Sequence, residues 1–216
     1  MPPFAELARL DSPHLDQLAL AIGAELRAID EAFALSELDR LAGLVVAEGP
    51  GGDPHEQLGA LEEVLGRRAG FLGDTEEYDH PDNSMLDIVL RRREGLPILL
   101  SIVWIEVGRR VGMPLRGVGL PGHFVAGWFG EGEPILVDPF RGGVAIGDAV
   151  PVHAIEPTPV HLTALRMCSN LVASYERRGD LGRMLTASRL RLELPLPERD
   201  RRVMEFEHKR LAARIN

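Results

Sequence analysis

His123 and Asp138 are the two residues whose types and spacing best fit acid–base chemistry. His123 begins a short run at 123–129, and Asp138 directly follows another at 134–137. Both runs have the pattern of strands and are separated by a glycine-bearing turn. Neighbouring strands joined by a turn lie side by side, so we expect the carboxylate to touch the imidazole and orient it as a general base. The alternative is that both are turn residues, each bonded only to the backbone.

A nucleophile for this pair is harder to find in the sequence. Ser101 lies one turn inside a helix predicted to begin at Pro97, and a hydroxyl there could face His123. The alternative is that it bonds the carbonyl one turn back, as serines inside helices commonly do. Cys168 is either a small buried residue of an amphipathic helix or the third member of a reordered Cys-His-Asp triad.

Arg91-Arg92-Arg93 precedes a predicted helix start and could clamp a carboxylate or a phosphate there. Because Asp87 and Glu94 are close in sequence, an internal cluster of ion pairs is the alternative. The chain has seven histidines, and no two of them are spaced as His-x-x-x-His. We therefore predict no metal site and no cofactor.

Composition narrows the class of protein further. A chain of 216 residues with 45% hydrophobic content can bury one substantial core, with an appended subdomain. The start lacks a signal-peptide pattern and no stretch approaches the roughly 20 apolar residues of a membrane helix, so we expect a soluble, cytoplasmic protein without a membrane partner. A net charge of −9 disfavours nucleic acid as a partner.

Hydrophobic periodicity predicts helices before and around the candidate chemistry. Three amphipathic helices are expected in the first eighty residues, opened by Asp11-Ser12-Pro13, by Ser36 as the cap of a helix over 37–48, and by Asp53-Pro54. Asn83-Ser84 is expected to cap a short helix that Gly95 stops. A nearly all-apolar helix then runs from Pro97 to Arg110, and this apolar circumference is typical of a central, buried helix.

Beyond residue 112 the pattern changes to strands and then back to helices. Strands are expected at 115–120, 123–129 and 134–137, forming a small antiparallel sheet on the central helix. Helices follow at 162–178, 181–194 and 198–215. Residues 177–216 hold eleven Lys and Arg against six Asp and Glu, a net +5, so −14 remains on residues 1–176. This basic tail is either a surface for docking a protein or an ordinary solvated helix surface.

Several separated motifs, in order along the chain, carry a family resemblance. They are Asn83-Ser84, Arg91-Arg92-Arg93-Glu94-Gly95-Leu96-Pro97, Leu99-x-Ser101, Gly112-Met113-Pro114, Gly117-Val118-x-x-Pro121-Gly122-His123-Phe124 and Asp138-Pro139-Phe140-x-x-Gly143. Together they resemble the SirB1 family, a bacterial branch of the transglutaminase-like superfamily. The resemblance runs from about residue 10 to the end and is strongest over 83–143.

The resemblance implies an α+β fold with a transglutaminase or papain-like core, in which a central buried helix packs on a small antiparallel sheet. It implies a SirB1 domain over 1–157, helical at 10–80 with its core at 83–150, and a tetratricopeptide-like helical part over 158–216. In active relatives a thiolate sits at the start of the central helix, where the helix dipole and an imidazolium lower its pKa. Here that position is Pro97, which cannot act as a nucleophile.

We therefore expect a non-catalytic protein of this fold that works by binding a protein or another ligand, with its C-terminal helices as a platform for a protein partner. The expected site keeps His123 and Asp138 as the remnant of a triad. The residues expected to line its pocket are Asn83, Ser84, Arg92, Gly95, Pro97, Gly122 and Phe124. The alternative is a hydrolase or acyltransferase that uses Ser101, or another nucleophile, with His123 and Asp138. No small-molecule ligand is identified by the sequence.

Overall fold

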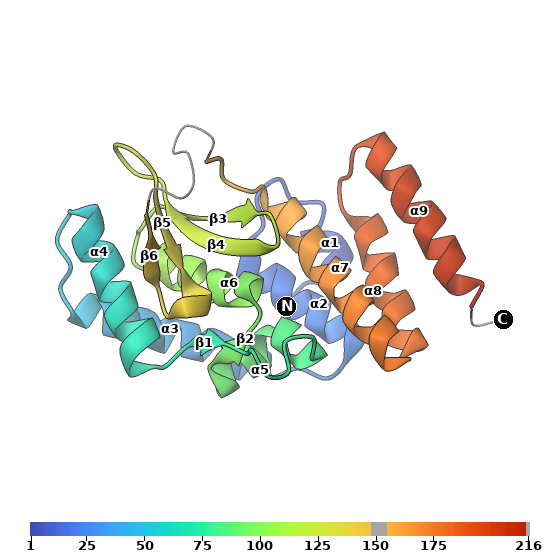
Figure 1. Cartoon of the computed structure of the whole chain (residues 1–216), viewed down its shortest axis with the longest axis horizontal. Helices are drawn as coiled ribbons and strands as arrows, with labels where there is room; N and C mark the ends of the chain where they lie inside the picture. The colour runs from blue at the N-terminus through green and yellow to red at the C-terminus, as the bar shows by residue number, and fades with distance from the viewer. Residues whose placement is uncertain (148–154, 215–216) are drawn as a thin grey trace.

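A computed structural model describes residues 1–147 and 155–214 of the chain. Helices precede and follow a four-stranded antiparallel sheet, so the fold is α+β as predicted (Figure 1). The α-helices are α1 (Phe4–Leu7), α2 (Leu15–Leu26), α3 (Glu31–Ala47), α4 (Pro54–Leu61), α5 (Leu86–Arg92), α6 (Pro97–Arg110), α7 (Val160–Arg178), α8 (Leu181–Glu193) and α9 (Glu198–Ala212). A π-helical segment, Glu62–Arg68, continues α4.

The main sheet has the strand order β3-β4-β5-β6, with every neighbouring pair antiparallel. Its strands are β3 (Leu115–Leu120), β4 (His123–Trp128), β5 (Ile135–Asp138) and β6 (Val144–Ile146). The first three confirm the predicted strands to within two residues at either end, and β6 was not predicted. A separate parallel pair joins β1 (Leu72–Gly73) to β2 (Glu94–Gly95), next to the start of α6.

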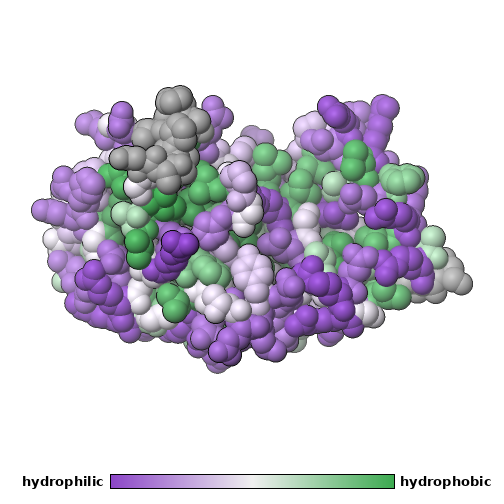
Figure 2. Space-filling model, viewed as in Figure 1, coloured by the Kyte–Doolittle hydropathy of each residue, from purple (hydrophilic) through white to green (hydrophobic). Residues whose placement is uncertain are grey.

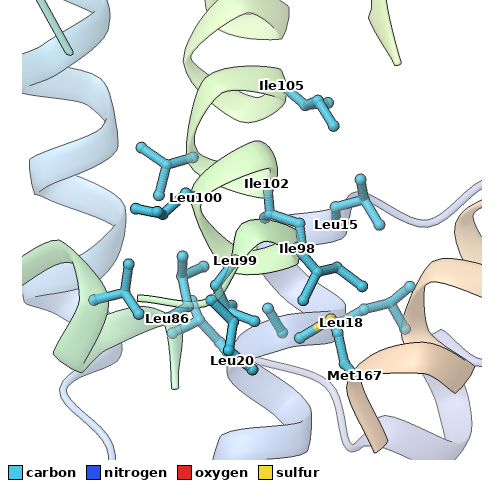
Figure 3. Close-up of a cluster of buried hydrophobic side chains, with 14 of the residues drawn as sticks. Leu15, Leu18, Leu20, Leu86, Ile98, Leu99, Leu100, Ile102, Ile105 and Met167 are labelled. Atoms are coloured by element: carbon cyan, nitrogen blue, oxygen red, sulfur yellow. The ribbon is translucent and has the colours of Figure 1, made fainter. Parts of the chain in front are cut away.

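Helix α6 is the centre of the core, as its apolar circumference predicted. Every residue from Pro97 to Gly108 is buried. Figure 3 shows α6 side chains meeting those of α2, α5 and α7, with Ile98 close to Leu18 and Met167. One continuous hydrophobic cluster therefore includes both the N-terminal helices and the first C-terminal helices. Burying apolar surface on all sides of one helix is the main stabilising contribution of such a core.

Four of the predicted helix signals act differently from expectation. Helix α2 begins at Leu15 after His14, so Asp11-Ser12-Pro13 lies before the helix and does not cap it. Asp53 does cap α4, with Pro54 at the first helical position. The cap of α3, however, is Asp30, which accepts from the Phe33 N–H, and Ser36 lies inside the helix and bonds a carbonyl. Asn83 and Ser84 belong to a 3₁₀ turn (Pro81–Ser84) and make no capping bond to α5. Helix α5 ends at Arg93, which takes the left-handed conformation at φ 66°, and not at Gly95.

Each of the three consecutive arginines pairs with a different carboxylate from elsewhere in the fold. The nitrogen-to-oxygen distances are 3.0 Å for Arg91 to Asp30 and 3.4 Å for Arg92 to Asp74, and Arg93 pairs closely with Glu37. The arginines thus bind the N-terminal helices to the turn before α6. This is the internal ion-pair cluster that the sequence offered as the alternative to an anion clamp.

The C-terminal helices form one end of the molecule, with α7 next to α2 and α9 outermost on α8 (Figure 1). They match the three predicted helices. The predicted end of the last helix, at residue 215, lies outside the described residues, and so does the predicted end of the core, at residue 150. Within residues 1–147 and 155–214, no helix is both long and apolar enough to cross a bilayer.

The Glu37 ion pairs give the fold an acid-sensitive contribution. Hydrogen bonds from Arg40, followed by those from Arg93, overcome the cost of burial and lower the pKa of Glu37 from about 4.5 to about 2. Folding therefore favours the ionised carboxylate. The resulting stabilisation is complete above about pH 4.5 and is lost as the pH falls toward 2.

Glu37→Gln should lower the free energy of unfolding by roughly 1 to 2 kcal/mol at neutral pH, because Arg40 is half-exposed and solvent screens part of the pair. Urea unfolding from pH 7 to 3 should show the difference from wild type shrinking with acidity. Glu62→Gln, in an exposed pair with Arg67, is the matched control and should change little. A difference that stays constant down to pH 3 would contradict this account.

Candidate functional site

His123 and Asp138 do come together, at the start of β4 and the end of β5. The His123 Nε2 and Asp138 Oδ1 atoms are 3.0 Å apart. The Asp138 side chain is 8% exposed and the imidazole 28%, so the carboxylate is shielded and the ring remains reachable. Asp138 combines the two predicted roles, contact with the imidazole and a bond to the backbone of a turn. Its Oδ1 also accepts the Phe140 N–H at 3.1 Å and caps the turn that follows.

The position of Asp138 is fixed by the 3₁₀ turn (Pro139–Arg141) and by Gly143. The Gly143 N–H donates to the Asp138 carbonyl at 2.8 Å, and the Gly143 backbone has φ +95°. A Cβ at Gly143 would stand 2.1 Å from the Trp104 ring of α6. Glycine is therefore required here for its backbone conformation and for the close approach to α6.

The ring nitrogen of His123 that bonds Asp138 determines which nitrogen stays available to a ligand. When the imidazole is neutral, donation from Nε2 to the carboxylate leaves Nδ1 as an acceptor. Among the described residues no side chain or backbone group bonds Nδ1. The Phe140 ring stands edge-on to the imidazole, with 6.0 Å between the two ring centroids. His123 is therefore oriented, with one nitrogen available to a ligand.

A cavity of about 180 Å³ opens beside His123. Its lining residues come from the start of α6, the β3–β4 turn, the segment before Pro81 and α7: Tyr78, Pro97, Ile98, Gly122, His123, Phe124, Arg166 and Asn170. Four of the residues predicted for the site, Pro97, Gly122, His123 and Phe124, thus share one cavity. This volume accommodates a small polar group and not a large molecule.

Pro97 is the first residue of α6 and lines the cavity. Its ring supplies no N–H and no nucleophilic atom, and its fixed φ suits the first helical position. The N–H groups of the next two residues, Ile98 and Leu99, have no carbonyl within the helix to accept them. The helix start therefore offers partial positive charge at the cavity, without a group that could attack a substrate.

Ser101 does not point at the imidazole. It is fully buried, and its hydroxyl donates to the Phe124 carbonyl at 3.3 Å. The expected bond to its own helix is therefore replaced by a bond to β4. Ser101 does not line the His123 cavity, and in this geometry it fixes the strand that carries His123 to the central helix.

Arg166, Asn170 and Tyr78 line the cavity and were missed as site residues. Arg166 donates to the His123 carbonyl at 2.9 Å, and its guanidinium lies 5.2 Å from the centre of the Phe124 ring. Burial, followed by the charge of Asp79, raises the pKa of Tyr78, so its hydroxyl is a donor at neutral pH. The sequence does place Arg166 and Asn170 on one face of a predicted helix, because they are four residues apart. It does not indicate which face of that helix packs against the sheet.

Three residues that were expected to line the pocket lie outside it and support the fold. The Asn83 side-chain amide donates to the Asp74 carboxylate at 3.0 Å and to the Glu77 carbonyl at 2.8 Å, and the Asn83 backbone carbonyl accepts the N–H of Leu96. Arg92 pairs with the same Asp74. Burial opposes ionisation of Asp74, but the bonds from the Glu77 N–H and Asn83, with smaller contributions from Glu76 and Arg92, lower its pKa.

Gly95 is the third of them, buried between α5 and the 3₁₀ turn (Pro81–Ser84). A Cβ on it would lie 2.7 Å from Val89. Asn83, Arg92 and Gly95 therefore hold the start of α6 and do not line the His123 cavity.

Ser84 lines a second cavity, of about 190 Å³. The side chain is 1% exposed, and its hydroxyl has no hydrogen-bond partner among the described residues. The lining residues are Tyr78, Asp79, His80, Ser84, Leu96, Asn170, Ala173, Ser174 and Arg177. Tyr78 and Asn170 line both cavities, so the two lie next to each other along α7.

Cys168 is fully buried in the core, and burial raises the pKa of its thiol to about 12. A protonated, enclosed thiol is not a nucleophile, which favours the reading of Cys168 as a core residue. Over residues 1–147 and 155–214, no three His, Cys, Asp or Glu side chains are grouped as ligands for a metal ion.

Comparisons with known proteins agree with the arrangement of central helix and sheet. The chain matches the transglutaminase-like superfamily over residues 32–185. A UPF0162 protein of Xylella fastidiosa (strain Temecula1) is 41% identical over 87 residues, which are 40% of this chain and 31% of the relative. A UPF0162 protein of Pseudomonas aeruginosa is 37% identical over 121 residues, covering 53% of this chain and 43% of the relative.

Human F-box only protein 21 is 34% identical over 83 residues, which are 38% of this chain and 13% of that protein. Among solved structures, a crystal structure of menin is similar with a TM-score of 0.47 and 13% identity, over 98% of this chain and 60% of that chain. Each sequence match to these relatives spans less than half of the relative's own length.

The orientation of His123 predicts its tautomer. Because Asp138 accepts from Nε2, the neutral ring should carry its proton on Nε2, and ¹⁵N chemical shifts in long-range ¹H–¹⁵N NMR spectra should show this directly. In Asp138→Ala the preference should relax toward a mixture. His161, which lies outside the site, serves as the internal reference. A wild-type ring protonated on Nδ1 would contradict the geometry.

Proposed function

Because the chain belongs to the transglutaminase-like superfamily, we propose that it is a non-catalytic member of this fold that holds an amide-bearing ligand at His123 without forming a covalent bond to it. The observation that carries the proposal is Pro97 at the start of α6, in the same cavity as an oriented imidazole. No serine, threonine, cysteine or lysine side chain is among the described residues lining that cavity. A base without a nucleophile can bind and orient a polar group.

The free polar atoms of the His123 cavity indicate the ligand class. The Nδ1 atom of neutral His123 accepts, whereas the Tyr78 hydroxyl donates, and the unpaired N–H of Ile98 lies in the first turn of α6. An amide group supplies both complements, an N–H for the imidazole and a carbonyl for the donors. A peptide bond or a glutamine-type side chain has this chemistry.

The proposal includes the finer assignment to the SirB1 family and a tetratricopeptide-like C-terminal part beginning near residue 158. The similarity to UPF0162 proteins supports a branch within the superfamily. The C-terminal helices are proposed as the platform for a protein partner. On α9, Val203 is 48% exposed and Phe206 69%, and Figure 2 shows hydrophobic residues among strongly hydrophilic ones over the α8 and α9 end.

The second candidate is a hydrolase or acyltransferase that uses Ser101. The 3.0 Å contact of His123 with Asp138 favours it, because this is how a general base is oriented. Ser101 would have to exchange its bond to the Phe124 carbonyl for one to Nδ1 and become reachable from the cavity. The binding function requires neither change, and we prefer it for that reason.

Acetamide, the smallest primary amide, separates the two functions. Titrated into ¹⁵N-labelled protein at millimolar concentration, it should shift the backbone amide signals of Ile98, Gly122 and Phe124 in a saturable way. His123→Ala should weaken this binding roughly tenfold, because a hydrogen bond made in a shielded site is lost. Ser101→Ala should weaken the binding much less than His123→Ala does, because Ser101 bonds β4 and does not line the cavity, and no ammonia should be released.

Ammonia release that depends on both Ser101 and His123 would establish the hydrolase instead. The absence of saturable shifts around His123 would contradict the binding function. The same spectra report whether each variant is folded, so loss of structure is recognised directly.

A further inference from the structure

Helix α9 lies outermost on α8 and meets it with one face (Figure 1). On that face the Leu211 side chain is buried, and Glu207 pairs with Arg191 of α8 at 3.1 Å. The His208 Nδ1 atom lies 3.1 Å from the Ser188 hydroxyl, which is also on α8. The opposite face of α9 is exposed.

The exposed face of α9 carries two apolar residues among bases. Its members follow each other at intervals of three or four residues, in two neighbouring rows that share Phe206, so they lie on one side of the helix. Phe206, at 69%, is the most exposed large hydrophobic side chain among the described residues. We call this surface the outer face of α9, and its members are Arg199, Arg202, Val203, Phe206, Lys209 and Arg210.

The acidic residues of α9 leave most of this positive charge uncompensated. Asp200 and Glu207 lie on the side of the helix that meets α8, and Glu205 is half-buried. Glu198 is the acid of α9 that lies next to the outer face, where it pairs with Arg202 at 2.9 Å. Four bases against this one acid give the outer face a net +3. Across the described residues, three of the bases have no carboxylate within ion-pair distance: Arg199, Lys209 and Arg210.

The composition of the outer face is that of a protein interface. Exposed aromatic and arginine side chains are the residues that contribute most to binding between proteins. The complementary surface has apolar side chains for Val203 and Phe206 and carboxylates around them. A helix lying along α9 supplies both, because its own side chains repeat at the same intervals of three and four residues.

Charge also separates this partner from other occupants. Two α9 helices from two copies of the chain would bring like charges together, which disfavours a symmetric pair through this face. A bilayer or a nucleic acid extends beyond α9, and its phosphates would also meet residues 1–176, which carry a net −14. A single acidic helix covers the outer face alone.

We infer that the outer face of α9 docks an acidic amphipathic helix of a partner protein. The apolar side of that helix covers Val203 and Phe206, and its carboxylates pair with Arg199, Lys209 and Arg210. This inference rests on the part of the proposed function that makes the C-terminal helices a platform, and it names the partner of that platform. It does not depend on the His123 cavity.

A fluorescein-labelled amphipathic peptide of Glu, Ala and Leu, with every Leu on one face, is the probe. Its fluorescence anisotropy should show saturable binding to the full chain, with an affinity that falls as salt is added. The same peptide with Lys in place of Glu should not bind. Phe206→Ser should weaken binding roughly tenfold or more, because the aromatic anchor is lost. The double variant Lys209→Glu, Arg210→Glu should weaken it at least as much.

Val46→Ser and Arg116→Glu are the matched controls. Val46 on α3 is 63% exposed and Arg116 on β3 is exposed, so each repeats one type of change outside α9 and should leave the affinity unchanged. Circular dichroism of each variant verifies that its helices are intact. Phe206→Ser should stay folded, because the side chain it replaces is mostly in solvent.

Equal binding of the Glu and Lys peptides, or an affinity that Phe206→Ser does not change, would overturn the inference. Tighter binding to vesicles of phosphatidylcholine and phosphatidylserine than to the acidic peptide would overturn it in favour of a membrane. Self-association in sedimentation that Phe206→Ser removes would overturn it in favour of a second copy.

The outcomes also separate this inference from the proposed function. Binding of the Lys peptide alone, lost in Phe206→Ser, would leave the platform standing and overturn its acidic partner. Acetamide shifts around His123 without binding of the acidic peptide would overturn the inference and leave the amide site standing.

Discussion

The burial of α6 on every side is the constraint on which the rest of the structure depends. Because all its residues from Pro97 to Gly108 are enclosed, each neighbouring element must approach the helix closely. Trp104 leaves no room for a side chain at Gly143, and the bond from Gly143 then fixes Asp138. Ser101 binds β4 at the Phe124 carbonyl, next to His123. The geometry of the imidazole and carboxylate thus follows from the packing of one helix.

Polar contacts fix the position of the start of α6, which apolar packing alone would not determine. Asn83 accepts the Leu96 N–H and binds Asp74, which also pairs with Arg92. Arg93 pairs with Glu37 of α3. These buried and partly buried bonds hold the first turn of the helix where two cavities meet it. Each of the three arginines is paired with a carboxylate of the same chain. The hydrogen-bond donors that line the cavities belong instead to α7 and to the segment before Pro81.

Much of this arrangement could be predicted from the sequence because it depends on local signals. The apolar circumference of α6, the alternation in β3 to β5 and the Asp53-Pro54 start are each encoded within a few residues. The meeting of His123 with Asp138 follows from the strand, turn and strand between them. The assignment of Pro97 to the position of a thiol rests on the family resemblance and stays a prediction.

What could not be predicted depends on contacts between distant segments. Arg166 and Asn170 reach the site only because α7 packs beside the start of α6, and no local pattern places that helix. The direction of the Ser101 hydroxyl was set by the nearness of β4. Asp30 caps α3 in place of Ser36, six residues earlier than expected, since the Asp30 region also bonds to Asp87 and Arg91. Tertiary contacts overrode the local preference in each case.

The central claim is that the His123 cavity has the geometry of a thiol-dependent site whose nucleophile position holds Pro97. Alkylation of Pro97→Cys by iodoacetamide at neutral pH, followed by intact-mass spectrometry, tests it most directly, with Cys168 as the buried, unreactive internal control. A new thiol at the helix start and near His123 should react roughly tenfold faster than the same thiol in Pro97→Cys with His123→Ala. Equal rates in the two variants, or a rate no greater than that of Cys168, would contradict the account.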